Sequence, residues 1–242
     1  MTALKLTIPV ATLVIWLLAS VAINAHYFPG PIDVFSTLIN DIPSGELITD
    51  VLSSAKRLFL GCSLGIIVAI VLGIVFGLFD KARVMLMPTL NALRAMPVIA
   101  LFPLIIMIFG ITEATSIFIV AFVAAIPTLI LTIDGVQQTR SEYSSLINNT
   151  TLSNSALIRH VLLPGAMPNI LSGLDLSINQ AFKVLILAEL MGVNSGLGFR
   201  ISEASEFLNY PKVYYLLIVI GIFALALNIA HSRFARRMLR WM

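Results

Sequence analysis

The sequence predicts an all-α membrane protein: one transmembrane domain over residues 1–242, with about six transmembrane helices. Hydrophobic residues make up 59% of the 242 residues and charged residues only 11%. The mean hydropathy is +1.00, which lies outside the range of soluble globular domains. An apolar run of about 20 residues crosses a bilayer as a helix. The runs in this chain do not alternate between polar and apolar residues, which excludes a β-barrel.

Six apolar runs are long enough to be spans, at about residues 6–25, 57–79, 86–109, 115–134, 169–192 and 213–231. Their orientation follows from the bias of Lys and Arg towards the cytoplasmic side of membranes. With the N-terminus inside, the inner segments hold nine of these residues, and the outer segments hold Lys56, Arg57, Arg200 and Lys212. We therefore expect both termini and the polar loop at about 135–166 to lie in the cytoplasm.

The first run is expected to be a retained span rather than a cleaved signal peptide. Residues 6–24 approach full spanning length, and no convincing small-residue cleavage pattern follows them. The outer segment 26–56 carries carboxylates and prolines, which favours a short surface helix between turns.

The second run carries small residues at four-residue steps: Gly61, Gly65, Ala69, Gly73 and Gly77. Successive members rotate by about 40° around an ideal helix, so they form a gently spiralling groove. Another helix must pack closely there. It belongs either to the same chain or to a second subunit.

Prolines interrupt the third and fourth runs, at Pro97, Pro103 and Pro127. Proline removes a backbone hydrogen bond and bends a helix, and bent helices are common around a transport pathway. Arg94 is expected within about two turns of the inner surface, where it either extends to the headgroups or makes a cytoplasmic gating contact. Arg94, Pro97 and Pro103 are therefore the candidate gate residues.

A polar interruption at 140–164 separates two strongly apolar regions. Five of its residues recur at three- and four-residue steps: Leu152, Ala156, Leu157, His160 and Val161. This spacing predicts a short amphipathic helix over 150–161, which Pro164 and Pro168 are expected to end. Such a helix between two spans offers a docking surface to a component outside the membrane.

The fifth run is the most polar of the six. Asp175, Asn179 and Lys183 are four residues apart and share a helical face that continues roughly to Glu189. Ionisable groups in a membrane are costly and usually face a cavity or a partner, so these four residues are candidates for the wall of a pathway. A charge network of Asp175, Lys183 and Glu189 that only holds spans together is the alternative, and one set of residues can do both.

The outer segment 193–212 contains Gly196 and Gly198, which favour a turn, and a short helix over 201–209 capped by Ser202 is expected after it. This segment either contacts an external binding protein or is simply solvated. The basic and aromatic end at 230–241 is expected to anchor at the inner headgroups.

Three stretches carry a family resemblance: Val161-Leu-Leu-Pro164-Gly-Ala-Met-Pro168 continuing to Leu174, Ala188-Glu-Leu-Met-Gly192 with Ser195-Gly-Leu-Gly198, and Arg94-Ala-Met-Pro97 with Phe102-Pro103-Leu-Ile. They resemble permease subunits of ABC importers, in the branch that handles nitrate, sulfonates, taurine and thiamine precursors. The resemblance implies the architecture of a type I ABC importer permease, whose cytoplasmic loop inserts into a cleft of an ATPase subunit. With the amphipathic positions included, the coupling-loop candidates are Ser145, Leu146, Ile147, Thr151, Leu152, Leu157, Val161, Leu163 and Pro164.

The chain departs from the family pattern in the first half of this loop. Ser145, Leu146 and Ile147 stand where the family has Glu-Ala-Ala, and Thr151 stands where it has Gly. A β-branched Thr does not easily adopt the positive φ that Gly permits, so any sharp turn there must be made differently. Asp175 also stands where these permeases commonly have Arg.

As the resemblance implies, two permease subunits, expected to be a homodimer, would enclose one pathway in a bacterial inner membrane. Two ATPase subunits would grip the loops, and a periplasmic or lipid-anchored substrate-binding protein would deliver a small anion or small organic molecule. The sequence has no phosphate-binding loop, so ATP and Mg²⁺ are expected on the ATPase chain, with no cofactor bound by this chain. No metal site, nucleic-acid partner or enzymatic activity of its own is expected, and lipid is expected to surround the spans.

Two rival functions remain open. A stand-alone ion-coupled transporter would use Asp175, Lys183 and Glu189 as a relay and would work without an ATPase. A scaffold homologue with a degenerate coupling loop would pair with a competent permease but not couple to hydrolysis.

Overall fold

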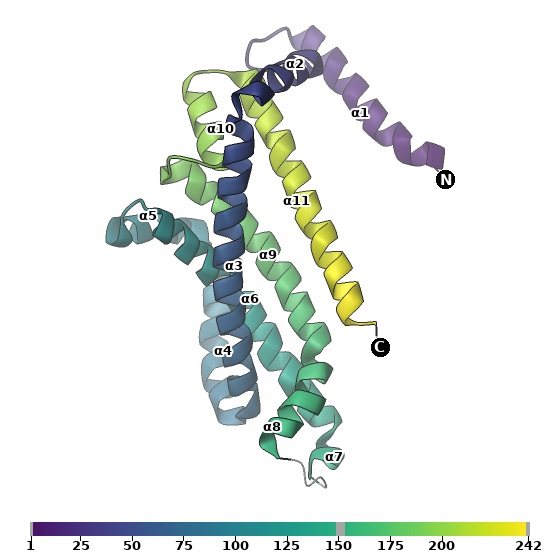
Figure 1. Cartoon of the computed structure of the whole chain (residues 1–242), viewed down its shortest axis with the longest axis vertical. Helices are drawn as coiled ribbons and strands as arrows, with labels where there is room; N and C mark the ends of the chain where they lie inside the picture. The colour runs from purple at the N-terminus through teal and green to yellow at the C-terminus, as the bar shows by residue number, and fades with distance from the viewer. Residues whose placement is uncertain (1, 149–152, 241–242) are drawn as a thin grey trace. The chain divides into compact units, whose positions relative to one another are not determined.

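The computed structural model describes residues 2–148 and 153–240, and within these ranges the regular elements are helical (Figure 1). In chain order they are α1 (Thr2–Ile23), α2 (Pro31–Asp41), η1 (Ile42–Ser44), α3 (Glu46–Leu78), α4 (Asp80–Ala95), α5 (Val98–Phe109), α6 (Glu113–Glu142), α7 (Ser144–Asn148), α8 (Asn154–Leu157), η2 (Ile158–Leu162), α9 (Leu163–Gly192), α10 (Leu197–Glu206) and α11 (Tyr210–Met238). The all-α prediction is therefore confirmed.

The helices form two compact units. Unit 1 comprises Met1–Ser54 and Glu189–Phe223, and unit 2 comprises Ala55–Ala188 and Ala224–Met242. Three long helices, α3, α9 and α11, contribute to both units, since each unit boundary falls inside one of them.

Among the described residues, four helical stretches are long and apolar enough to cross a membrane: Glu46–Leu78, Glu113–Glu142, Ser155–Gly192 and Tyr210–Met238. A fifth candidate is the pair α4 and α5, bent by 100° at its break. In α1 the apolar part Thr7–Ile23 is shorter. The multi-pass character is therefore confirmed, whereas the number of six spans remains a prediction.

Residues 86–109, which we expected to form one bent span, are two helices that meet at Met96 and Pro97. Met96 has an extended backbone (ψ 132°) and Pro97 is the N-cap of α5. The residue before a proline is disfavoured in the helical region, so α4 ends there rather than bending. Pro103, by contrast, lies inside α5.

α6 is the central helix of unit 2. In its most apolar stretch of 18 residues 67% are buried, compared with 33% in the same kind of stretch of α3 and 11% in that of α11. Three hydrophobic clusters of described residues in unit 2 include α6 residues, among them Ile119, Ile130 and Val136. Thr128 and Thr132 of α6 are fully buried as well. Ser177 of α9 donates a hydrogen bond to the Ala124 carbonyl at 2.6 Å.

The row of small residues on α3 lies against α6 of the same chain. A methyl group added at Gly73 would stand 2.6 Å from Cβ of Thr132, and one at Gly77 would stand 2.7 Å from Cβ of Val136. Gly61 and Gly65 face Val120 and Ala121 in the same way, and Ala69 is 1% exposed. Only residues without a larger side chain permit this approach of the two helices.

In unit 1, α1 packs on the segment that leads into α2. The Trp16 indole donates to the Pro29 carbonyl at 3.2 Å and stacks on Tyr214, with ring centroids 6.2 Å apart. Asp33 accepts a hydrogen bond from the Gly30 amide and so helps begin α2.

Candidate coupling and translocation sites

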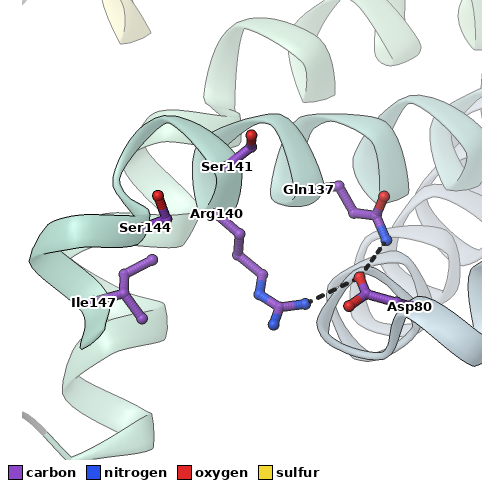
Figure 2. A pocket seen from close by; sticks show the side chains of 6 residues that line it. All are labelled: Asp80, Gln137, Arg140, Ser141, Ser144 and Ile147. Atoms are coloured by element: carbon purple, nitrogen blue, oxygen red, sulfur yellow. Dashed lines mark hydrogen bonds and ion pairs between the residues drawn. The ribbon is translucent and has the colours of Figure 1, made fainter.

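A polar cavity of about 310 Å³ lies in unit 2 where α6 ends and α7 begins (Figure 2). It is lined by Asp80, Gln137, Arg140, Ser141, Ser144 and Ile147. These residues come from the start of α4, from the last turns of α6, and from α7. The cavity therefore borders the segment that the sequence predicts as the coupling loop.

Arg140 joins the end of α6 to the end of α3. Its guanidinium donates to the Leu78 carbonyl at 2.8 Å and lies 3.5 Å from Asp80 Oδ1. A cation at the last carbonyl of a helix stabilises that helix end. Gln137 donates to the same Asp80 carboxylate at 3.2 Å, so the α3–α4 turn is held by two side chains of α6.

Two further contacts link the same part of α6 to α4 and α9. Arg83 of α4 lies 3.3 Å from Asp134, and Asn169 of α9 donates to Gln138 at 3.1 Å. The last two turns of α6 thus contact the three helices around them. A displacement of α7 would reach α3, α4 and α9 through this one helix end.

The predicted coupling residues lie on α7, α8, η2 and the first turn of α9. Ser145, Leu146 and Ile147 are in α7, and Ile147 lines the cavity. Leu157 ends α8, Val161 lies in η2, and Leu163 and Pro164 begin α9; all four are half-buried. Thr151 and Leu152, together with the side chain of Leu146, lie outside the described residues.

The expectation that Pro164 and Pro168 end the amphipathic helix is wrong. Helix continues from Ser155 to Gly192 through both prolines. Residues Ile158–Leu162 form a π-helical segment, in which the Leu163 amide donates to the Ile158 carbonyl five residues earlier. In this widened turn the backbone amide of residue 164 is not needed as a hydrogen-bond donor. A proline, which has no amide hydrogen, is therefore tolerated there.

The four pathway candidates of α9 are not brought together. Asp175 and Lys183 are eight residues apart, about 12 Å along a helix, and Glu189 lies about 9 Å further on. Asn179 donates to the Asp175 carbonyl at 2.8 Å within the helix, and Lys183 is exposed. The alternative of a charge network of Asp175, Lys183 and Glu189 stays a prediction.

Asp175 lies beside a residue of α11 that the sequence did not suggest. His231 Nδ1 is 3.1 Å from Asp175 Oδ1. Both side chains line an open cavity of about 760 Å³ between α9 and α11 in unit 2. Asp175 therefore lies on an accessible face of α9.

Glu189 has a different environment, inside unit 1, where its side chain is 1% exposed. Ser54 is 2.8 Å from both carboxylate oxygens, and the Gly198 amide donates to Oε2 at 3.1 Å. Ser54 also accepts from the Leu197 amide at 3.0 Å, and Asp50 accepts from the Gly196 amide at 2.9 Å.

Asp50, Ser54 and Glu189 therefore cap α10 from outside, and we call these three residues the α10 anchor. The N-cap of α10 is Gly196, which has no side chain to provide a cap. Gly196 has φ +112°, and a methyl group there would stand 2.7 Å from Glu189 Oε2. The free amides at the start of the helix favour the two carboxylates. Helix α10 begins at Leu197, so the expected cap at Ser202 is wrong.

Charged side chains extend this network along α10. Arg200 donates to Asp50 Oδ2 and to Glu203, both at 2.7 Å. Burial acts to lower the pKa of Arg200, but the Asp50 and Glu203 carboxylates outweigh it and raise the pKa. Lys212 lies 2.8 Å from Asp41. Burial acts to raise the pKa of Asp41, yet hydrogen bonds from Lys212 and Tyr215 lower it overall.

The gate candidates lie at the α4–α5 break. Arg94 is exposed in the last turn of α4, and Pro97 and Pro103 are exposed on α5. Their positions leave both interpretations of Arg94 open.

Sequence reasoning missed Asp50, Ser54, Arg200 and His231. The closely spaced glycines after Glu189 were a signal that its carboxylate is approached by backbone. No comparable signal marked Ser54, whose partner is 135 residues away.

Comparison with known proteins shows clear similarity over the chain. Residues 64–242 match the model of the family described as binding-protein-dependent transport system inner membrane component. The chain is 31% identical to SsuC of Bacillus subtilis, a permease named for aliphatic sulfonate transport, covering 98% of this chain and 86% of that protein. It is 29% identical to the taurine transport system permease TauC of Escherichia coli, covering 97% and 88%.

A solved structure shares the fold. The inward-facing MetNI methionine ABC transporter matches with a TM-score of 0.69 at 17% identity, over 82% of this chain and 98% of that one.

Proposed function

Because the chain belongs to the family of binding-protein-dependent transport system inner membrane components, as a multi-pass permease subunit of an ATP-driven ABC importer, we propose that the segment from the end of α6 to the start of α9 receives the ATPase stroke. ABC permeases of this family are not enzymes themselves. ATP and Mg²⁺ would be bound by separate ATPase chains, two of which would dock on α7, α8 and η2.

One observation carries this proposal: the end of α6 contacts α3, α4 and α9 and borders the cavity beside α7. An ATPase that moves α7 would tilt the end of α6, and Arg140 would pass this movement on to the end of α3. Since packed helices have discrete arrangements, such a tilt would select between inward- and outward-open states.

We place the pathway between two copies of the chain, with Asp175, Asn179 and Lys183 of α9 on its wall. The cavity beside Asp175 and the exposure of Lys183 support this placement. Glu189 would instead hold α10, since its carboxylate is buried and hydrogen-bonded.

The proposed cargo is a small organic anion of the sulfonate class. The sulfonate- and taurine-related names of the relatives support this class, and the Lys183 ammonium offers a charge that suits it. An extracytoplasmic substrate-binding protein would deliver the cargo to the outer ends of the helices, in the inner membrane of a bacterium.

The test is co-purification of the detergent-solubilised chain with its ATPase subunits. Ile147→Asp and Leu157→Asp replace an apolar side chain of α7 and of α8 with a carboxylate, and each is expected to lower ATPase recovery about tenfold or more. Ser205→Asp adds the same charge on the exposed side of α10 and serves as the control.

The proposal is supported if the wild-type chain and the control variant recover stoichiometric amounts of the ATPase and the two loop variants do not. If the wild-type chain recovers no ATPase, the coupling role fails, and uptake without an ATPase becomes the next measurement.

A further inference from the structure

The connection between α10 and α11 exposes two large apolar side chains side by side. Phe207 is 79% exposed and Leu208 is 60% exposed. We call this pair the apolar tip. The residues around it, Ser205, Glu206 and Asn209, are exposed as well.

The backbone holds the apolar tip in an unusual conformation. Leu208 has φ +54°, in the left-handed region. The Asn209 amide donates to the Ala204 carbonyl at 2.9 Å and the Leu208 amide to the Ser205 carbonyl at 3.1 Å. This pair of bonds ends a helix with a left-handed residue at a position that is usually glycine. A leucine there is strained, and strain of this kind clusters where a side chain has a function.

The helix that carries the tip is fixed to unit 1. The α10 anchor satisfies its first amides, and Arg200 pairs with Asp50 and with Glu46, the first residue of α3, at 3.0 Å. The tip is therefore presented on a rigid element rather than on a loose loop.

The tip lies beyond the apolar part of α3. Gly196 bonds to Asp50 and Arg200 reaches Glu46, so α10 runs towards the start of α3. Phe207 is about 10 Å further along α10 than Arg200. Glu46 itself is 11 residues before the predicted start of the span at 57. This position favours a partner in water over a lipid acyl chain.

The surroundings of the tip are acidic. Within unit 1, the helices α2, α3, α10 and α11 carry six carboxylates and two cations: Asp33, Asp41, Glu46, Asp50, Glu203 and Glu206 against Arg200 and Lys212. Both cations are already paired with carboxylates. In a two-fold contact between two copies, the same acidic residues would face each other, which is unfavourable.

We propose that the apolar tip, Phe207 and Leu208, is the anchor of the docking site for the extracytoplasmic substrate-binding protein, an inference that rests on the proposed function. Its partner surface would be an apolar pocket rimmed by basic side chains. In protein–protein contacts a few residues that become buried at the centre carry most of the binding energy.

The experiment uses the importer, assembled from this chain and its ATPase subunits in nanodiscs, with the purified substrate-binding protein of the same system as the probe. ATPase stimulation is titrated against binding-protein concentration for Phe207→Ser, Leu208→Gly and the control Tyr27→Ser, which removes a 63% exposed aromatic elsewhere in unit 1.

Phe207→Ser and Leu208→Gly are each expected to raise the half-saturating concentration about tenfold or more. Basal hydrolysis and the Tyr27→Ser titration are expected to match wild type. Leu208→Gly separates docking from folding, because glycine relieves the backbone strain and the thermal midpoint is expected to stay the same or rise.

Unchanged half-saturation in both variants overturns the docking role of the tip. So does loss of the permease pair in size-exclusion chromatography, which would assign the tip to a second copy, or an effect that disappears when the lipid is changed, which would assign it to the membrane. A wild-type importer that the binding protein does not stimulate defeats the proposed function itself, whereas stimulation that survives both variants defeats only the tip.

Discussion

At the scale of single residues, Glu189 shows how a buried carboxylate acquires its role from distant partners. Its position on the polar face of α9 suggested a pathway wall, because spacing along a helix reveals which residues share a face but not what lies against it. The structure places Ser54 and the Gly198 amide on its oxygens. A buried carboxylate is tolerated when hydrogen-bond donors reach its oxygens, and here a backbone amide and a hydroxyl do so.

Glu189→Ala is expected to lower the free energy of unfolding by about 2–4 kcal/mol, because it leaves the Gly198 amide and the Ser54 hydroxyl without their acceptor. Thermal unfolding in detergent measures this with a thiol-reactive dye, since the single cysteine, Cys62, is buried in the folded chain. Glu206→Ala, an exposed carboxylate on α10, is the control. Equal midpoints for the two variants would argue against the anchor.

At the scale of helices, the sequence predicted well which helical segments exist, but it predicted poorly where they begin and end. The four-residue repeat of small residues correctly required a closely packed helix, and that helix is α6. The repeat could not name the partner, because small residues permit contact with any helix. Pro164 and Pro168 were interpreted as a break since their local effect is known, whereas the π-helical turn that accommodates Pro164 has no sequence signature of its own.

Gly73→Ala is expected to destabilise unit 2 despite the higher helix propensity of alanine. The new methyl would stand 2.6 Å from Cβ of Thr132, which is fully buried and cannot move aside. Overpacking of this kind costs about 1–3 kcal/mol, against a propensity gain of about 1 kcal/mol.

Gly221→Ala in α11 is the matched control, because nothing lies within 4 Å of an added methyl there. Its thermal midpoint is expected to equal or exceed that of wild type. A midpoint for Gly73→Ala that rises with that of the control would show that α3 and α6 are less closely packed.

At the scale of the whole molecule, composition was enough to predict a multi-pass helical protein, and three short stretches were enough to suggest its family. The coupling loop was located from one polar interruption between apolar runs. Its internal structure was predicted less well, since α7 and the end of α6 lie where a loop was expected. The α10 anchor escaped prediction because its members are spread from Asp50 to Glu189.

Lys183→Gln is expected to lower ATP-driven uptake of radiolabelled taurine into proteoliposomes about tenfold, because it removes the positive charge proposed to meet the anion on α9. Lys56→Gln removes an exposed lysine that pairs with Glu113, and it is expected to leave uptake unchanged. If the two variants support equal uptake of taurine, Lys183 does not lie on the pathway wall.

The α10 anchor also constrains how the chain is made. Asp50 and Ser54 leave the ribosome well before Gly196 and Leu197, their partners 146 and 143 residues later. At a synthesis rate of about 5–20 residues per second, the two polar side chains wait roughly 7–30 s before α10 exists. During that interval the start of α3 has no native acceptor or donor for them, so it must stay in water or against the insertion machinery. The α10 anchor is therefore completed only late in synthesis, and a nascent chain stalled before residue 196 would display an open polar helix end to quality control.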